Sequence, residues 1–410
     1  MDYKITPPTS AIDTEVALPA SKSISNRMLM LRALCRGSLP ELHNVAECDD
    51  TSAMETALGT NQEYVNIGAA GTAMRFMTAY FATCEGRTTV LDGSERMRCR
   101  PIKILVDALR SCGARISYAG EEGYPPLRIE GCRMHARSVS ISGSVSSQYI
   151  SAILMIAPVI GCSRVELTGD VVSLPYIKMT LSMMRGMGVD CTLEDNVVKI
   201  APNSSYKPVE MTVESDWSAA SYWYELAALF PSSRITLQGL EQDSVQGDSA
   251  VARLMSEFGV KTDYRPGKVT ISSASASRGV VEMDLGENPD LAQTIVVTAC
   301  LAGRHFVISG LKTLKIKETD RIEALRAELR KLGYVLSVSG DVSLEWHGER
   351  CDPTPNPHIA TYADHRMAMA FAPAAILFPG IVVEDAEVVS KSYPHFWDHL
   401  EGSGFKIERV

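Results

Sequence analysis

Apolar and polar positions along the chain follow a pattern that recurs every 70 to 76 residues. Each copy begins with a strand rich in Val, Ile and Leu, passes through a polar turn, and enters a helix that often ends near a glycine. When the copies are aligned on Leu91, Leu167, Leu237, Ile308 and Val383, the differences between these numbers are 76, 70, 71 and 75. A constant period of this kind indicates internal structural repeats. We expect six units, of which the first, residues 38–59, is degenerate.

A second and more apolar helix precedes each copy. These helices begin in the segments SKSISNRMLML, GTAMRFMTAYF, SSQYISAILMI, SAASYWYELAAL, DLAQTIVVTAC and DHRMAMAFAPAAIL. Helices that are apolar on most faces are buried in a core. Strands that alternate with helices predict an α/β architecture. Six units therefore suggest two lobes of three, each with buried helices.

Composition and charge limit the classes of partner. The net charge of −9 and the pI of about 5.5 argue against nucleic acid and anionic membranes, which are bound by basic surfaces. None of the ten cysteines forms a C-x-x-C pair, so zinc ribbons and thioredoxin-like motifs are not expected. The start, MDYKITPPTS, lacks the apolar region of a signal peptide, and no apolar run could span a membrane. We expect a cytoplasmic protein.

Cations stand at the starts of several predicted helices. They are Lys22 and Arg27 in the first buried helix, Arg75 in the second, Arg366 in the sixth, and Lys317 and Arg321 beside an amphipathic helix. A cation at this place opposes the helix dipole, at a cost of a few tenths to about 1 kcal/mol. A bound anion would reverse that cost, because backbone N–H groups and the cation would converge on it. Solvated surface charge explains any single case, but the recurrence favours binding of small anions.

Carboxylates at other helix starts allow two interpretations. Asp216, Asp290 and Asp364 open the fourth, fifth and sixth buried helices, and Glu318 follows Lys317. Aspartate is a preferred N-cap, but acid–base chemistry also needs carboxylates beside the cations. The sequence alone does not separate a cap from a catalytic group at these positions. Asp320 and Glu323 form a plausible capping pair for the amphipathic helix.

Other clusters carry weaker signals. The loop GAAG at 68–71 would admit close approach of an anion, but it is not a P-loop. The arginines that alternate through 96–100 would share one face of an extended segment as a basic strip, or lie in a solvated loop. His395 and His399 lie four residues apart but lack a third ligand, so we expect no metal site.

In combination, these segments closely resemble the enolpyruvyl transferases, and within them the branch that acts on shikimate 3-phosphate. The resemblance rests on LPASKSISNR, GTAMR, SSQYISAILM, IKETDRIEAL, ADHRMAMAF and SKSYPHF, and covers nearly the whole chain. It implies an inside-out α/β barrel fold of two similar domains, each built from three units with buried helices and outward-facing sheets. The domains would comprise residues 20–213, and residues 1–19 with 214–410. The active site would lie in the interdomain cleft.

The resemblance also implies a reaction. The enolpyruvyl group of phosphoenolpyruvate would move to the 5-hydroxyl of shikimate 3-phosphate by addition and elimination, with release of phosphate. Because this chemistry needs only a proton donor and a proton acceptor, no metal or cofactor is expected. The alternatives are the transferase that acts on UDP-N-acetylglucosamine and a non-catalytic anion-binding homologue. The product would serve aromatic amino-acid biosynthesis, and nothing suggests an obligate oligomer, so we expect a monomer.

Residue roles are carried over from the motifs that match. The catalytic residues would be Asp290, which would accept the hydroxyl proton, together with Glu318 and Lys22. Shikimate 3-phosphate would be bound by Lys22, Ser23, Arg27, Ser146, Ser147, Gln148, Ser173, Tyr176, Asp290 and Lys317. Phosphoenolpyruvate would be bound by Lys22, Gly71, Arg96, Gln148, Arg321, Arg366 and Lys391. Arg75 would support the site without touching the ligand.

Some positions depart from the usual family pattern. Ala69 stands where Asn is usual, Phe76 where Pro is common, Leu174 where a basic residue is frequent, and Thr313 where some members carry Asn. The charged positions are all present, so activity is expected. Glyphosate occupies the phosphoenolpyruvate site in this family, and altered geometry beside Gly71 predicts reduced sensitivity to it.

Overall fold

The computed structural model describes residues 1–35, 41–340 and 342–410. The start of the degenerate first copy, residues 38–40, lies outside the described residues. The chain forms two compact units. Unit 1 comprises Met1–Ala20 and Glu214–Val410, and unit 2 comprises Ser21–Val213.

Three apolar helices form the centre of unit 2: α1 (Lys22–Leu34), α3 (Gly71–Thr83) and α6 (Ser147–Ile156). They pack against one another and are almost entirely buried, as their sequences predict. The remaining helices are α2 (Asp49–Gly59), α4 (Glu95–Arg98), α5 (Lys103–Ser111) and α7 (Leu174–Gly186). Of these, α5 shows the amphipathic spacing most clearly, with Leu105, Val106 and Leu109 buried.

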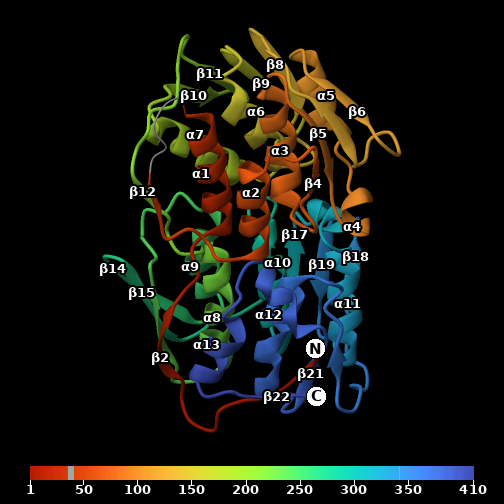
Figure 1. Ribbon diagram of the computed structural model, residues 1–410. Coiled ribbons are helices and arrows are strands. Elements are labelled where there is room, and N and C mark those ends of the chain that lie inside the picture. The colour runs from red at the N-terminus through yellow and green to blue at the C-terminus, as the bar shows by residue number, and fades with distance from the viewer. Residues whose placement is uncertain (36–40, 341) are drawn as a thin grey trace. The chain divides into compact units, whose positions relative to one another are not determined.

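The sheets of unit 2 lie around these helices (Figure 1). One has the order β4-β5-β7-β6, another β10-β11-β9-β8, and a third pairs β12 with β3. Their bounds are β3 (Leu42–His43), β4 (Tyr64–Asn66), β5 (Thr88–Asp92), β6 (Arg115–Tyr118), β7 (Leu127–Glu130), β8 (Ser138–Ser142), β9 (Arg164–Thr168), β10 (Cys191–Glu194), β11 (Val197–Ile200) and β12 (Met211–Thr212). Along β9, Val165 and Leu167 are buried while Arg164 is exposed, so one face of the sheet packs on the helices and the other meets solvent.

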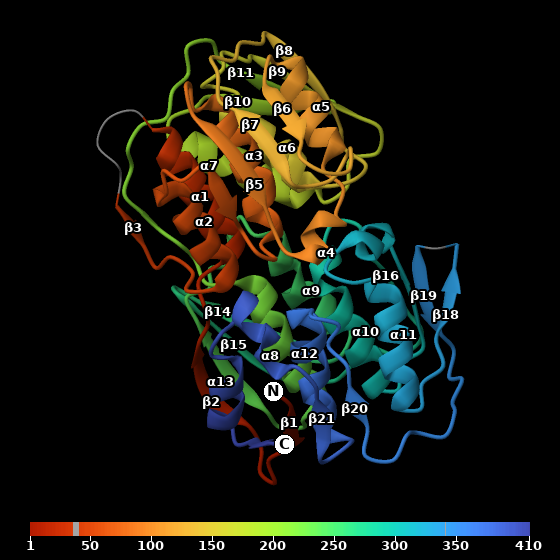
Figure 2. The same ribbon diagram turned by 45° about the vertical axis from the view of Figure 1, so that its right-hand side comes forward.

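Unit 1 repeats the arrangement with α8 (Trp217–Leu229), α10 (Ala292–Leu301) and α12 (His365–Phe371) at its centre (Figure 2). The bulky side chains of Trp217, Trp223 and Tyr222 fill this core and are at most 1% exposed. The other α-helices are α9 (Val251–Ser256), α11 (Arg321–Lys331) and α13 (Phe396–Gly402). Short 3-10 helices are η1 (Gly247–Ala250), η2 (Pro289–Leu291), η3 (Lys312–Ile316), η4 (Ala372–Ile376) and η5 (Ala386–Lys391).

The N-terminal strands complete two sheets of unit 1. β1 (Tyr3–Thr6) pairs antiparallel with β21 and β22, and β2 (Asp13–Ala17) pairs parallel with β13. The sheets have the orders β20-β21-β1-β22, β14-β15-β13-β2 and β16-β17-β19-β18. Their other strands are β13 (Arg234–Gln238), β14 (Val260–Arg265), β15 (Lys268–Ser273), β16 (Val281–Asp284), β17 (Phe306–Ser309), β18 (Ser337–Ser339), β19 (Ser343–Trp346), β20 (His358–Ile359), β21 (Ile381–Val383) and β22 (Lys406–Arg409).

The predicted fold class is confirmed. Each unit surrounds three buried helices with sheets whose outer faces are solvated, which is the inside-out α/β arrangement. In the described residues, five sheets have four strands, whereas the degenerate first copy contributes β3 to a two-stranded sheet. The period in the sequence therefore corresponds to one helix-backed sheet per copy.

One buried acid in the core of unit 1 makes stability depend on pH. Glu225 in α8 is 0% exposed, and neither of its carboxylate oxygens has a hydrogen-bond partner in the described part of the chain. Burial raises the pKa of Glu225 well above its usual range, and the neighbouring Thr298 hydroxyl only partly offsets this. The folded protein therefore keeps a proton on Glu225 at a pH where the unfolded chain has released it.

Glu225→Gln should increase the free energy of unfolding at pH 7 and above, because an amide needs no proton uptake to stay neutral. The destabilisation caused by Glu225 is absent below its unfolded pKa of 4.5 and grows by about 1.4 kcal/mol per pH unit until the folded pKa is reached. Urea denaturation from pH 5 to 8 measures the difference, with Glu282→Gln, an exposed residue of β16, as the control. A constant difference between Glu225→Gln and the parent across this range would contradict a protonated Glu225.

Candidate active site

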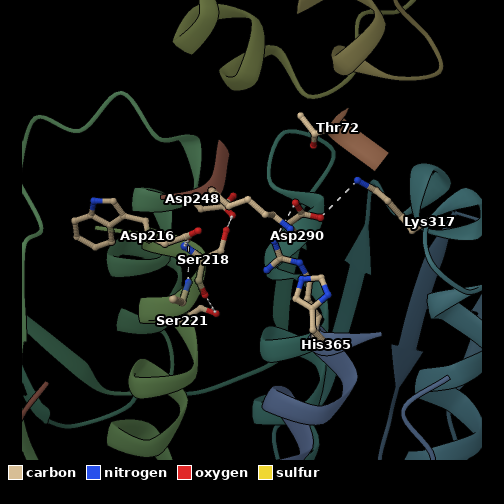
Figure 3. Close-up of polar contacts among 12 residues, drawn as sticks. Thr72, Asp216, Ser218, Ser221, Asp248, Asp290, Lys317 and His365 are labelled. Carbon is tan, nitrogen blue, oxygen red and sulfur yellow. Dashed lines mark hydrogen bonds and ion pairs between the residues drawn. The ribbon is translucent and has the colours of Figure 1, made fainter. Parts of the chain in front are cut away.

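Three cations of unit 1 form ion pairs with the carboxylate of Asp290. Its Oδ1 lies 3.5 Å from Lys317 Nζ and 3.1 Å from Arg321 Nη1, and its Oδ2 lies 3.1 Å from Arg366 Nη2. Figure 3 shows Lys317 reaching toward Asp290. Asp290 belongs to η2, and α10, which follows, has no side-chain cap. The structure thus places Asp290 among charges that could hold an anion.

Asp216 and Asp364, the other two aspartates that open buried helices, are N-caps. Asp216 accepts hydrogen bonds from the backbone N–H groups of Ser218 and Ala219 at the start of α8. Asp364 accepts one from Arg366 N at the start of α12. Of the three aspartates that open buried helices, only Asp290 is not a cap.

Arg321 ties this cluster together from the first turn of α11. It is 1% exposed, and its guanidinium binds both oxygens of buried Asp364, at 2.7 Å through Nε and 3.3 Å through Nη2. Nη2 also lies 3.0 Å from Glu318 Oε2. Although burial alone would lower the pKa of Arg321, the carboxylates of Asp364, Glu318 and Asp290 raise it above its usual value. Arg321 is therefore a permanent positive charge.

The start of α11 follows the predicted capping pattern in part. Asp320 Oδ1 accepts hydrogen bonds from Ile322 N at 3.1 Å and Glu323 N at 3.3 Å, so the prediction is confirmed for the cap. The Glu323 carboxylate binds Arg326 at 2.9 Å instead of returning to the backbone of Asp320. The reciprocal half of the pair is therefore wrong.

Glu318 and Lys391 form the second half of the unit 1 cluster. Lys391, the last residue of η5, places its Nζ 2.9 Å from Glu318 Oε1, and both side chains are at least 85% buried. Arg366 donates to the Tyr222 hydroxyl at 3.4 Å as well as pairing with Asp290. Cations from three separate elements thus converge on two carboxylates.

These charges control the ionisation of Asp290. Burial alone would raise the pKa of Asp290, but Arg366, Lys317 and Arg321 outweigh burial and hold that pKa well below its usual range. Among the residues that the structure describes, these ion pairs join four cations (Lys317, Arg321, Arg366, Lys391) to three carboxylates (Asp290, Glu318, Asp364), so the sum of these charges is 4 − 3 = +1. An anion is therefore favoured at this cluster, beside an ionised carboxylate that can accept a proton.

In unit 2, Arg27 is a buried cation held by neutral groups. It is 2% exposed. Its guanidinium donates to Thr180 Oγ1 at 2.8 Å, the Ser23 carbonyl at 2.8 Å and Ser151 Oγ at 3.2 Å. Burial lowers the pKa of Arg27 to about 10, so it stays charged at neutral pH. Among the described residues no carboxylate is ion-paired with Arg27, which leaves its charge available to an anionic ligand.

Two aromatic rings enclose the same guanidinium. The Arg27 Cζ lies 5.5 Å from the Phe76 ring centroid and 5.8 Å from that of Tyr176. Tyr176 was predicted as a ligand contact, and Phe76 is one of the departures from the family pattern. Ser173, just before α7, is buried and has φ 55°, a strained conformation for a non-glycine residue. Strain of this kind is common at ligand sites.

Lys22, the first residue of α1, has a buried carboxylate partner. Its Nζ lies 3.3 Å from Asp50 Oδ2, and the two side chains are 14% and 5% exposed. Ser21, the residue before α1, does not cap the helix with its side chain. Asp50 was not anticipated, because an acid in the first turn of α2 looks like an ordinary match to the helix dipole.

The starts of α3 and α6 lie together in unit 2. Gln148 Nε2 donates to Thr72 Oγ1 at 3.2 Å, and Ser146 caps α6 by accepting from Gln148 N at 3.3 Å. Ser147 is the first residue of α6 and is buried. The predicted hydroxyl and amide residues are therefore gathered at one end of the central helices.

Gly71 begins α3 under a tight constraint. A Cβ atom built there would lie 2.7 Å from Arg100 Nη1, closer than real Cβ contacts allow. Arg75 donates to the Gly71 carbonyl at 3.1 Å, and its guanidinium lies 5.9 Å from the Tyr149 ring centroid. Arg100 leaves no room for a side chain at residue 71, and Arg75 holds the Gly71 carbonyl by a hydrogen bond.

The extended basic strip considered for residues 96–100 is wrong. Residues 95–98 form the helix α4, which turns successive side chains to different sides. Arg96 and Arg98 are exposed, whereas Arg100 is buried. Arg98 pairs with Asp92 at 2.6 Å. Arg96, which was predicted to bind phosphoenolpyruvate, is exposed on the same helix.

The histidines near the C-terminus are engaged with protein groups. His399 Nδ1 lies 2.9 Å from the Tyr393 hydroxyl, and His395 Nδ1 lies 3.1 Å from Asp398 Oδ2. No cluster of three or more His, Cys, Asp or Glu within the described ranges is arranged to hold a metal ion. None of the helices in that part of the chain has the length and apolar character to span a membrane.

Comparison with known proteins gives one consistent family. The family model described as EPSP synthase (3-phosphoshikimate 1-carboxyvinyltransferase) matches residues 6–61 and 57–400. The chain is 48% identical over 409 residues to 3-phosphoshikimate 1-carboxyvinyltransferase of Bacteroides fragilis strain YCH46, covering 100% of this chain and 99% of that protein. It is 36% identical to the protein of the same name from Idiomarina loihiensis, covering 94% and 95% of the two chains.

The fold is also similar to solved structures. An EPSP synthase structure from Acinetobacter baumannii superposes with a TM-score of 0.77 at 21% identity, and both chains are covered completely. At this level of identity the likeness concerns the fold.

Proposed function

This chain belongs to the EPSP synthase family, and on that premise we propose how its two charged clusters carry out the family's reaction. The enzyme is a 3-phosphoshikimate 1-carboxyvinyltransferase of the shikimate pathway. It transfers the enolpyruvyl group of phosphoenolpyruvate to the 5-hydroxyl of shikimate 3-phosphate, giving 5-enolpyruvylshikimate 3-phosphate and phosphate. The cluster of unit 1 supplies the acid–base groups, and both clusters supply cations for the two anionic substrates.

The observation that carries this assignment is the position of the Asp290 carboxylate, whose oxygens lie 3.1 to 3.5 Å from three cations. In the addition step, the hydroxyl O–H bond breaks and its proton passes to Asp290, while the oxygen forms a bond to carbon 2 of phosphoenolpyruvate. The double-bond electrons take a proton at the methylene carbon, supplied by the protonated form of Glu318 or by the Lys22 ammonium. In the elimination step the methyl group returns that proton to the same residue, the bond between carbon 2 and the phosphate oxygen breaks, and the leaving phosphate takes the proton held by Asp290. Glu318, bound to both Arg321 and Lys391, is placed to alternate between the two roles.

We assign the cations of both units to the phosphate and carboxylate groups of the two substrates. Arg321, Arg366 and Lys391 in unit 1 and Lys22, Gly71, Arg96 and Gln148 in unit 2 are the proposed contacts of phosphoenolpyruvate. Shikimate 3-phosphate is assigned to Lys22, Ser23, Arg27, Ser146, Ser147, Gln148, Ser173, Tyr176, Asp290 and Lys317. The buried guanidinium of Arg27, which lacks a carboxylate partner in the described residues, supports a phosphate contact.

The acceptor is tested by measuring phosphate release from phosphoenolpyruvate with shikimate 3-phosphate and with UDP-N-acetylglucosamine. Release with shikimate 3-phosphate alone is expected. Activity with the nucleotide sugar and none with shikimate 3-phosphate would favour the rival transferase. Release with neither acceptor would favour a binding protein without catalytic activity.

We also propose a cytoplasmic monomer. All ten cysteines are free, which fits a reducing compartment. Analytical ultracentrifugation of the purified chain at micromolar concentration should give a single species of about 44.6 kDa.

Glyphosate should inhibit this enzyme more weakly than relatives that carry Asn and Pro at the positions of Ala69 and Phe76. The Phe76 ring is fully buried beside Arg27, five residues after Gly71 in α3, so a side chain different from proline packs behind the start of that helix. The inhibition constant against phosphoenolpyruvate measures the effect. The double variant Ala69→Asn with Phe76→Pro should lower the constant, and an unchanged value would show that these positions do not set sensitivity.

A further inference from the structure

A fourth carboxylate, Asp248, lies next to the Asp290, Glu318 and Asp364 carboxylates of unit 1 and takes no part in the proposed reaction steps. Asp248, in η1, is 3% exposed. Its Oδ2 accepts a short hydrogen bond from the Ser218 hydroxyl in the first turn of α8. Its Oδ1 is buried and has no hydrogen-bond partner among the residues that the structure describes. A buried carboxylate with a hydrogen bond to only one of its oxygens lowers the stability of the fold, which suggests that Asp248 serves the function of the site.

The position of Asp248 couples it to Asp290. In Figure 3, Asp248 lies on the side of Asp290 that faces the start of α8. The loop before Asp290 is fastened to η1, because Asn288 Nδ2 donates to the Gly247 carbonyl at 2.8 Å. Burial and the negative charge of Asp290 raise the pKa of Asp248 to about 6, against the opposing effects of Arg366 and Ser218. Each carboxylate therefore responds to the charge on the other.

The charged groups around Asp248 come from three elements. Asp216 faces it from the start of α8, Asp290 from η2 and Arg366 from α12. The only charged residue of α9, which follows η1, is Arg253, and it is exposed. The ionisation of Asp248 therefore depends on two carboxylates, Asp216 and Asp290, and on one cation, Arg366.

We propose, resting on the function assigned above, that Asp248 is a positioning residue whose negative charge keeps Asp290 basic enough to take the proton of the attacking hydroxyl. The three cations around Asp290 make it a weak base, since they favour its ionised form. The charge of Asp248 opposes them from the α8 side. Asp248 exchanges no atom with the substrates, because the hydroxyl proton still passes to Asp290. Protonation of Asp248 weakens the base and slows the addition step.

The test compares pH profiles of kcat and kcat/KM from pH 5 to 8 for the parent enzyme, Asp248→Asn and Ser218→Ala. Asp248→Asn mimics the protonated form, so its kcat at pH 7 should be about tenfold lower, with KM values changed much less. Ser218→Ala removes a hydrogen bond to the ionised form, so its acidic limb should move to higher pH while its plateau stays at the parent value. Asp263→Asn, an exposed position on β14, should match the parent throughout.

The phosphate groups of the substrates titrate near pH 6 as well, but they do so identically with every variant. A difference between the limbs of the parent and Ser218→Ala therefore reports on Asp248. A purely structural role would lower kcat by one factor at all pH values and leave the limb in place, which would overturn the proposal. Parental kcat for Asp248→Asn at pH 7 would overturn it too. Ser218→Ala remains decisive if Asp248→Asn does not fold.

Asp290→Asn separates the role of Asp248 from the assigned function. If the parent enzyme releases no phosphate with shikimate 3-phosphate, or if Asp290→Asn is fully active, the functional assignment is wrong. If Asp290→Asn is impaired while Asp248→Asn and Ser218→Ala behave as the parent, only the role of Asp248 is wrong.

Discussion

Asp290→Asn is expected to lower kcat by about 10²- to 10⁴-fold, the range that loss of a general base usually costs. The amide keeps the size of the side chain but cannot accept the hydroxyl proton. The substitution also removes a negative charge from beside Lys317, Arg321 and Arg366, so the KM for phosphoenolpyruvate should stay the same or fall. Steady-state kinetics at pH 7 separates the two effects.

The control for this substitution is Asp243→Asn in the exposed loop before η1, which should have parental kinetics. A rise in KM without loss of kcat would mean that Asp290 binds substrate and does not act as a base. A loss of less than tenfold, which is about 1.4 kcal/mol in the barrier, would remove Asp290 from the catalytic group.

Arg321→Met is expected to destabilise unit 1 by about 3–5 kcal/mol, the usual cost of removing one partner from a buried ion pair. The Asp364 side chain is 0% exposed and would lose both of its contacts with the guanidinium, while Asp290 and Glu318 would each lose one. Urea denaturation monitored by tryptophan fluorescence measures the loss, since Trp217 and Trp223 are buried in the same unit.

Arg326→Met is the matched control, because it lies on the same helix but pairs with Glu323 at the surface and is 39% exposed. Its effect should be within about 0.5 kcal/mol. Adding Asp364→Asn to Arg321→Met should recover part of the stability, since the buried charge is then removed as well. A loss below 1 kcal/mol for Arg321→Met, or no recovery in the double variant, would show that the cluster does not hold unit 1 together.

Some elements of the site could be predicted because they depend on local sequence. Asp320 was predicted as the cap of α11 and is one, since capping requires only the chain within three residues. The same local reasoning failed for residues 96–100. An alternating pattern predicts a shared face only if the backbone is extended, and the segment instead turns into the helix α4.

Other features could not be predicted because they join residues far apart in the chain. Asp216, Asp290 and Asp364 look equivalent in the sequence, yet Asp290 alone meets cations from residues 317, 321 and 366. Asp248 stands in an ordinary polar loop and becomes notable only because η1 packs against α8 and is hydrogen-bonded to Asn288, just before η2. No local signal marks such a residue, since its ionisation depends on burial and on neighbours in space.

The sequence by itself determined the α/β class, the repeating unit and its buried helices, because hydrophobic period and helix signals are properties of neighbouring residues. Its motifs also pointed to the correct family. Tertiary structure alone decided which carboxylates are caps and which are ionised beside cations. It also showed that Lys22 is paired with Asp50, whereas Arg27 is held by hydroxyls, a carbonyl and aromatic rings. The physical reason is that desolvation and Coulomb energy depend on distances between segments, which the order of residues along the chain does not contain.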